Sequence, residues 1–368
     1  MDETAASTPA PIFVVGPSRS GTTLLRHILN RHERVWLTGE TRYFEDLRPT
    51  LRTNGSRQLS PLERGRCERF FARISARRRT NAHEPEAVRR EADRLGGSAD
   101  AYFEAFCRLR AHRRGAEIWG EKTPSHVFRI ADMLAAYPAA RFICLVRDPR
   151  AVVASTRDAW RRPSFRRRRT RKRMKENYAR AKRQYNIVLS ALLWNATVRA
   201  AYDARATFGA AAVFIQPYEE LVTTPETAVR RLAAWLGIDY QASMLSDLKV
   251  VASSYASVAG KAGISTEPLT RWSSVLTAEE IAVVQLVTRR YMRALGYERQ
   301  ETSPSPLRLA AVLGAIPVAV LRALAANRDR AGRSFEFARR RLSPLLVRRG
   351  LPDARARASR AGSKVGEG

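Results

Sequence analysis

Cysteine and histidine are scarce in this sequence, and neither is arranged as a disulfide framework or a zinc site requires. The 368 residues contain three cysteines and five histidines, with no paired cysteine spacing. Disulfide scaffolds and zinc modules repeat such residues at short, regular intervals. We therefore expect no metal and no disulfide framework, and a reducing compartment, the cytoplasm, is the expected location.

A long apolar run is also missing near the C-terminus. Leu309–Leu321 is a charge-free stretch of thirteen residues that is interrupted by Gly314 and Pro317, whereas a helix needs about twenty apolar residues to cross a bilayer. We expect a helix that packs on the domain, with a helix at the inner membrane surface as the alternative. The first residues, MDETAASTPAP, are polar and acidic, so export by a signal peptide is not expected.

Acidic residues are outnumbered, with 35 Asp and Glu against 66 Lys and Arg and a formal net charge of +31. Much of the excess lies in two runs. Residues 161–183 hold thirteen basic residues and one Glu, and residues 328–368 hold twelve basic and four acidic residues. Such charge attracts phosphates, sulfates and anionic membrane faces. No groove-reading motif or aromatic interleaving accompanies the runs, so nucleic acid is not an expected partner.

The pattern of apolar residues predicts an α/β fold with a mainly parallel central sheet. Short β-branched runs alternate with longer amphipathic stretches, which is typical of such folds. The clearest strands are Ile12–Val15, Phe142–Val146 and Val213–Ile215. Helices are expected at Thr22–Arg31, Arg150–Trp160, Lys172–Arg205, Glu226–Leu236 and Thr277–Leu295.

The predicted organisation places one α/β domain between two extensions. A disordered N-terminus covers residues 1–10, and the domain covers 11–303, with a helical insertion at 48–114 and the basic segment at 161–183. That basic segment is predicted either to border a binding cleft, where it would attract an anionic ligand or membrane, or to be a solvated helix face or loop. A helical extension at 304–348 precedes a basic tail at 349–368 that is expected to be disordered.

A phosphate-binding loop is predicted directly after the first strand. Residues 12–25 read IFVVGPSRSGTTLL, in which a loop from Gly16 to Gly21 leads into a helix that begins at Thr22. Backbone N–H groups at such a helix start bind anions. The spacing matches the nucleotide-triphosphatase loop except that Thr22 occupies the position of its Lys. The missing Lys argues against triphosphate hydrolysis, because that side chain reaches the β- and γ-phosphates.

The loop resembles the 5′-phosphosulfate loop of the sulfotransferases that use 3′-phosphoadenosine 5′-phosphosulfate (PAPS). Residues 141–155, RFICLVRDPRAVVAS, resemble the 3′-phosphate motif of the same family. Arg147 at a strand end has a fork suited to a phosphate, and Ser155 adds a hydroxyl about two turns into the next helix. The resemblance implies PAPS as co-substrate, bound by Ser18, Arg19, Ser20, Gly21, Thr22, Thr23, Arg147 and Ser155.

Two short strings supply candidates for the chemistry. Gly39-Glu40-Thr41-Arg42 resembles the pattern of the tyrosylprotein-sulfotransferase branch, which implies Glu40 as general base, although an ion pair with Arg42 or Arg19 is the structural alternative. Lys122, in Glu121-Lys122-Thr123-Pro124, resembles the lysine that contacts the transferred sulfuryl group. His126 is expected to be a capping or packing residue, and Asp148 to cap the helix that begins near Pro149.

Weaker matches lie downstream. Pro217-Tyr218-Glu219-Glu220-Leu221 resembles a family element whose Tyr lies near the nucleotide. Residues 253–274, which include Ser254 and Lys261, resemble the region that closes over the cofactor in that family. The resulting hypothesis is a sulfotransferase that transfers a sulfuryl group to a hydroxyl of a glycolipid, carbohydrate, small metabolite or tyrosine. The alternatives are a kinase-like phosphotransferase and a non-catalytic anion- or membrane-binding protein. The sequence does not indicate an oligomeric state.

Overall fold

The computed structural model describes residues 9–52, 55, 57–77, 84–158, 185–246, 248 and 263–325. The chain divides into two compact units, each of which is treated by itself. The first unit comprises Met1–Leu145, Ala204–Gln216 and Thr224–Leu248. The second unit comprises Val146–Asp203, Pro217–Thr223 and Lys249–Gly368.

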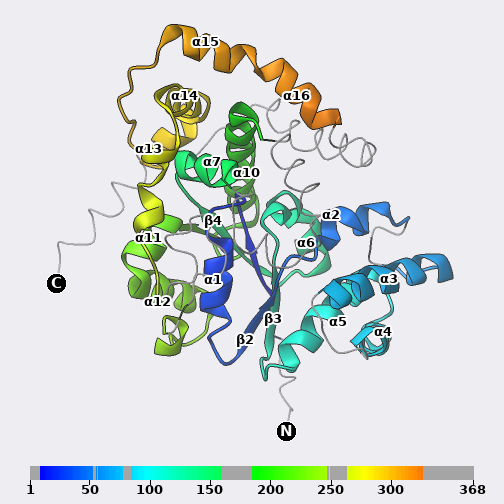
Figure 1. The fold of residues 1–368 in the computed structure, drawn as a ribbon. Helices are drawn as coiled ribbons and strands as arrows, with labels where there is room; N and C mark the ends of the chain where they lie inside the picture. The colour runs from blue at the N-terminus through cyan, green and yellow to red at the C-terminus, as the bar shows by residue number, and fades with distance from the viewer. Residues whose placement is uncertain are drawn as a thin grey trace, which may run out of the picture. The chain divides into compact units, whose positions relative to one another are not determined.

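A five-stranded sheet forms the centre of the fold (Figure 1). Its strands stand in the order β2-β3-β1-β4-β5. The pairs β1–β3, β1–β4 and β2–β3 are parallel, which confirms the predicted α/β class. The strands are β1 (Ile12–Val15), β2 (Val35–Thr38), β3 (Ile118–Lys122), β4 (Arg141–Val146) and β5 (Val213–Pro217).

Strand β3 is an element that the sequence pattern does not predict. It lies between β2 and β1, with Lys122 opposite Val14 and Gly120 opposite Ile12. A Cβ on Gly120 would lie 1.9 Å from the Ile12 carbonyl oxygen, so only glycine allows this close approach. All five residues of β3 are buried, including Glu121.

Several helices of the first unit form the insertion between β2 and β3, and the others lie elsewhere along the chain. In the insertion, α3, α4 and α5 pack against one another (Figure 1). Helix α1 ends at Leu29, two residues before the predicted end, because the Asn30 side chain exchanges two hydrogen bonds with the Leu37 backbone. The helices are α1 (Thr22–Leu29), α2 (Tyr43–Asp46), α3 (Pro61–Arg77), α4 (Glu84–Arg94), α5 (Ala99–His112), α6 (Ile130–Ala136) and α12 (Pro225–Leu236), with 3-10 turns η1 (Arg48–Thr50), η2 (Pro124–Arg129) and η4 (Ala242–Met244).

An aromatic core joins the insertion to the sheet within the first unit. Phe13 of β1 packs on Phe103 of α5 and on Trp119 of β3. Tyr43 stacks on Phe103, with ring centroids 5.0 Å apart. The Tyr43 hydroxyl donates to Asp100 at 2.7 Å, so its polar end is satisfied inside the core.

The second unit is helical in its described part. Helix α14 agrees with the predicted Thr277–Leu295 helix, since Thr277 is its N-cap, in a capping box with Glu280, and Leu295 is its C-cap. The predicted Leu309–Leu321 helix is instead two helices that meet at Ala315, between Gly314 and Pro317. The elements are α7 (Pro149–Arg157), α10 (Ile187–Phe208, which enters the first unit), α11 (Tyr218–Thr223), η5 (Glu267–Leu269), α13 (Trp272–Val275), α14 (Ala278–Ala294), α15 (Pro306–Gly314) and α16 (Ile316–Ala325).

Part of the C-terminal extension packs on the second unit. Leu309 and Val312 of α15 contact a buried cluster that includes Val283 and Val284 of α14. Within the described ranges, no helix has the length and apolar character needed to span a membrane. The basic segment at 161–183 and the tail at 349–368 lie outside the described residues.

Candidate active site

The loop after β1 has the backbone of an anion cradle. Gly16 has φ 130°, and a Cβ there would lie 2.3 Å from the Leu145 carbonyl oxygen. Arg19 has φ 77°, a left-handed conformation that is rare outside glycine. Gly21 has φ 90° and occupies the cap position of α1. Because Gly21 has no side chain, the first N–H groups of α1 remain accessible to an anion.

The predicted side chains of this loop differ in exposure. Ser18 is exposed, Arg19 and Thr23 are partly exposed, and Thr22 is buried. Ser20 is fully buried, and no described residue forms a hydrogen bond with its Oγ. A buried hydroxyl without a partner is unfavourable, and a phosphate oxygen would satisfy it.

The segment that follows β3 is tied to the anion loop. The Gly16 N–H donates to the Pro124 carbonyl at 3.0 Å. Lys122 is paired with Val14 in the sheet, two residues before Gly16. Since the carboxyl ends of parallel strands meet at one edge of a sheet, the two motifs lie at the same edge of the first unit.

Glu40 and Lys122 form an ion pair at this edge, with Lys122 Nζ 2.5 Å from Glu40 Oε1. The Glu40 side chain is 49% exposed, whereas that of Lys122 is 7% exposed. Burial lowers the pKa of Lys122, and the Glu40 carboxylate offsets part of this effect. Arg42, the partner considered for Glu40 in the sequence, donates to Glu45 at 3.1 Å.

Two basic side chains of α1 share the surroundings of Lys122. Arg26 Nη2 is 3.0 Å from His27 Nε2. Burial lowers the pKa of His27 to about 4, and the positive charges of Arg26 and Lys122 act in the same direction. His27 is therefore neutral at pH 7, and neither residue is singled out by the sequence pattern.

Glu121 is a buried carboxylate that the sequence analysis leaves without a role. Its Oε1 accepts hydrogen bonds from the Thr41 N–H and hydroxyl, both at 2.6 Å, and from the Thr123 hydroxyl at 2.8 Å. Its Oε2 lies 3.0 Å from His126 Nδ1. His126 is itself buried, as its expected packing role requires.

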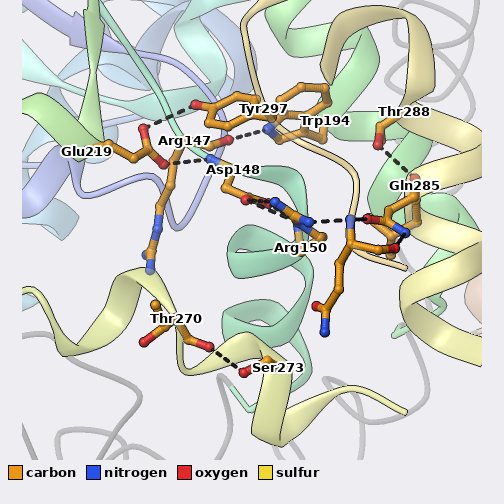
Figure 2. Close-up of polar contacts among 12 residues, drawn as sticks. Arg147, Asp148, Arg150, Trp194, Glu219, Thr270, Ser273, Gln285, Thr288 and Tyr297 are labelled. Atoms are coloured by element: carbon orange, nitrogen blue, oxygen red, sulfur yellow. Dashed lines mark hydrogen bonds and ion pairs between the residues drawn. The ribbon is translucent and has the colours of Figure 1, made fainter. Parts of the chain in front are cut away.

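Arg147 begins the corresponding motif of the second unit. Its guanidinium carbon lies 4.4 Å from the centroid of the Tyr218 ring, and Nη2 donates to the Pro268 carbonyl. The Arg147 carbonyl accepts from Trp194 Nε1 at 2.8 Å (Figure 2). Burial raises the pKa of Tyr218, and the positive charge of Arg147 opposes this rise. The structure thus brings Arg147 and Tyr218 together.

Asp148 and Arg150 form a buried ion pair beside Arg147 (Figure 2). Asp148 caps α7 by accepting from the Arg150 N–H at 2.7 Å, which agrees with the predicted capping role. Both Asp148 oxygens accept from the Arg150 side chain, and Arg150 Nη1 donates to Gln285 at 3.1 Å. Glu219 accepts from the Asp148 N–H at 2.9 Å. The pair therefore fixes the backbone that carries Arg147.

Of the three other residues predicted to contact the co-substrate, one lies among the described residues. Ser155 is buried on α7. Ser254 and Lys261 lie outside the described residues. Among the residues that the structure describes, no group of three or more His, Cys, Asp or Glu side chains could hold a metal ion.

The fold and the site define an α/β protein with a glycine-containing loop between β1 and α1 and a carboxylate–lysine pair at one sheet edge. Residues 11–242 match the model of the Sulfotransferase family, so the chain belongs to that family.

Individual relatives are distant. A protein of Caenorhabditis briggsae, named as a candidate protein-tyrosine sulfotransferase, is 23% identical over 80% of this chain and 91% of its own. Nodulation protein NoeE of Sinorhizobium fredii (strain NBRC 101917 / NGR234) is 25% identical over 81% of this chain and 68% of its own. The solved sulfotransferase domain of the Synechococcus PCC 7002 olefin synthase has a TM-score of 0.50 and 21% identity, and it covers 81% of this chain and 98% of that domain. That similarity supports the fold.

Proposed function

We propose that this sulfotransferase transfers the sulfuryl group of PAPS to an acceptor hydroxyl, with Glu40 as general base and Lys122 on the transferred group. The observation that carries the proposal is the 2.5 Å contact between Lys122 Nζ and Glu40 Oε1 at the edge that bears the anion loop. A base for the acceptor and a cation for the leaving oxygen are thereby held together.

The proposed reaction uses these two side chains in sequence. Glu40 takes the proton of the acceptor hydroxyl as the acceptor oxygen forms a bond to sulfur. The bond between sulfur and the 5′-phosphate oxygen breaks, and adenosine 3′,5′-bisphosphate leaves with that bond's electron pair. Lys122 stabilises the negative charge that develops on the bridging oxygen.

The proposed co-substrate contacts follow the family resemblance. In that proposal the 5′-phosphosulfate binds the loop after β1 through the residues Ser18, Arg19, Ser20, Gly21, Thr22 and Thr23. Arg147 and Ser155 bind the 3′-phosphate, and Tyr218 lies near the nucleotide. The left-handed Arg19 and the buried Ser20 hydroxyl support the first set, and the contact of Arg147 with Tyr218 supports the second. Ser254 and Lys261 stay predictions from the family resemblance.

Transfer of ³⁵S from labelled PAPS to a panel of hydroxyl compounds tests this proposal across the candidate acceptor classes. The panel contains a glycolipid, an oligosaccharide, a phenol and a tyrosine peptide. We expect wild-type protein to label at least one class and Glu40→Gln to label it at a rate about 10²–10⁴-fold lower. Equal rates for the two proteins would contradict the assigned role of Glu40.

A specific observation also favours contact of α15 and α16 with an anionic membrane surface. Leu307, Leu313, Val318 and Leu321 are 83%, 41%, 49% and 66% exposed, although α15 also packs apolar residues inward. Arg308 and Arg322 are the ionisable residues of these two helices, and the sequence beyond them is basic. Exposed apolar side chains with flanking basic residues are typical of helices that bind anionic membrane interfaces.

Vesicle sedimentation tests the membrane proposal with the full chain. We expect binding to vesicles that contain phosphatidylserine, little binding to phosphatidylcholine vesicles, and loss of binding in Leu307→Ser/Leu321→Ser. Ala278→Ser at the start of α14 is the control. The proposal would be contradicted if the double variant bound the vesicles as well as wild type does. It would also be contradicted if wild-type protein self-associated through these side chains without binding lipid.

A further inference from the structure

Two neighbouring charged residues of strand β3, Glu121 and Lys122, contact different partners. Successive side chains of a strand point to opposite faces. Lys122 reaches Glu40, whereas Glu121 reaches Thr41, the residue that follows Glu40. Two consecutive residues of the strand therefore hold two consecutive residues of the loop that carries the proposed base.

We propose that Glu121 is a positioning residue, which acts by fixing Thr41 and hence the Glu40 main chain at the end of β3. The inference rests on the proposed role of Glu40 as base. Glu121 itself is 1% exposed, and its side chain contacts Thr41 and Thr123, so it acts through the backbone that carries Glu40.

The geometry around Glu121 favours one arrangement of the loop. A single oxygen, Oε1, accepts from the Thr41 N–H, the Thr41 hydroxyl and the Thr123 hydroxyl. The Thr41 hydroxyl in turn accepts from the Tyr43 N–H at 3.1 Å. Arg42, between them, has φ 61°, a left-handed conformation that needs support from its surroundings. Both residues that flank Arg42 are thus tied to this carboxylate.

The second carboxylate oxygen, Oε2, lies within ion-pair distance of the helical turn after β3 but forms no hydrogen bond with a described residue. His126 Nδ1 lies 3.0 Å from Oε2, and the His126 ring meets the edge of Phe44, with centroids 5.5 Å apart. Burial tends to raise the pKa of Glu121, but His126 and the Thr41 hydrogen bonds outweigh it, and the pKa lies below its usual range. A charged acceptor is worth about twice a neutral one for such donors.

A double-mutant cycle separates positioning from general stability. We expect Glu121→Gln, which keeps the shape but removes the charge, to lower kcat about 10–100-fold, the loss typical of outer-shell substitutions. The Kd for adenosine 3′,5′-bisphosphate should stay within about threefold of wild type, because the amide leaves the anion loop unchanged. In a Glu40→Gln background, Glu121→Gln should lower kcat less than about threefold further.

Two controls accompany the cycle. Glu117→Gln removes the exposed partner of Arg34 just before β3 and should leave kcat unchanged. Thr41→Val removes one donor to Glu121 while keeping the backbone N–H, and it should lower kcat less than Glu121→Gln does. If Glu121→Gln does not fold, Thr41→Val against Thr41→Ser, which restores the hydroxyl, carries the test. Equal rates for these two, or losses that multiply fully in the double variant, would overturn the inference.

Labelling of Lys122 provides a readout that needs no sulfuryl transfer. Acetic anhydride reacts with the unprotonated amine, and mass spectrometry follows the Lys122 peptide. We expect faster labelling in Glu40→Gln and Glu121→Gln than in wild type, and no further increase in the double variant. If the labelling rates are as expected but wild-type protein transfers no sulfuryl group, only the proposed function is contradicted. If Lys122 of Glu121→Gln is labelled at the wild-type rate, the positioning role is contradicted.

Discussion

The two motif regions hold Lys122 and Arg147, the cations that we propose to be functional, in different ways. In each, a buried carboxylate is the chain neighbour of the cation: Glu121 precedes Lys122, and Asp148 follows Arg147. Glu121 is held mainly by hydroxyl and N–H donors and by His126. Asp148 is held by the guanidinium of Arg150. The Glu40–Lys122 pair keeps its carboxylate half exposed, whereas both members of the Asp148–Arg150 pair are buried. This difference fits the proposed roles, which are chemistry for the first region and phosphate binding for the second.

Glu40→Gln removes the carboxylate of the Glu40–Lys122 pair, and it has the largest expected effect on kcat. We expect kcat to fall about 10²–10⁴-fold, because the acceptor loses its base. Calorimetry should show bisphosphate affinity close to wild type, since the anion loop is unchanged. A comparable fall in affinity would place Glu40 in co-substrate binding instead.

Arg150→Ala removes the cation of the buried Asp148–Arg150 pair in the second region. It leaves Asp148 buried without its guanidinium partner, so we expect the free energy of unfolding to fall by about 3–5 kcal/mol. Urea denaturation measures this loss. Arg230→Ala, which removes an exposed pair with Glu226, is the control and should change stability by less than about 0.5 kcal/mol. A similar small change for Arg150→Ala would show that the buried pair does not hold the motif.

Arg147→Ala separates binding from stability in the same region. Hydrogen bonds to charged groups contribute about 1.5–3 kcal/mol, so bisphosphate Kd should rise about 10–100-fold. The urea midpoint should shift less than in Arg150→Ala. Unchanged affinity would mean that this arginine does not bind the 3′-phosphate.

The pH dependence of stability sharpens the description of the first region. The pKa of His27 is about 4 in the folded chain, below the ordinary value of 6.5. Between these values the unfolded chain binds a proton that the folded chain does not, so stability is full above about pH 6.5 and falls as the pH drops toward 4. Because His27 is partly exposed, we expect a loss of about 1–2 kcal/mol. His27→Gln should flatten this part of the urea midpoint–pH curve; the same slope in both proteins would contradict the assignment.

The sequence predicts the strands that are purely apolar and misses the one that carries the site. Ile12–Val15 matches β1 without change, and Phe142–Val146 is extended by one residue in β4. In β3 only Ile118 and Trp119 are large and apolar, and the strand ends in Gly120, Glu121 and Lys122. Hydropathy fails there because the site buries charged residues in a strand.

Motif matching predicts which residues matter better than how they are held. The pattern singles out Glu40 and Lys122, and the structure joins them. As an alternative to the base role it offers an ion pair of Glu40 with Arg42 or Arg19, and it gives Glu121 no role. A contact between residues 80 positions apart, such as Thr41 with Glu121, depends on the order of strands β2, β3 and β1. That order follows from packing of the whole sheet.

Calorimetric titration of the wild-type chain with adenosine 3′,5′-bisphosphate, with Mg·ATP as the comparison, tests the central claim most directly. We predict binding of the bisphosphate in the micromolar range and no measurable binding of Mg·ATP, because Thr22 replaces the lysine that triphosphate loops use. Binding of Mg·ATP with no binding of the bisphosphate would contradict PAPS as the sulfuryl donor and favour a kinase-like phosphotransferase.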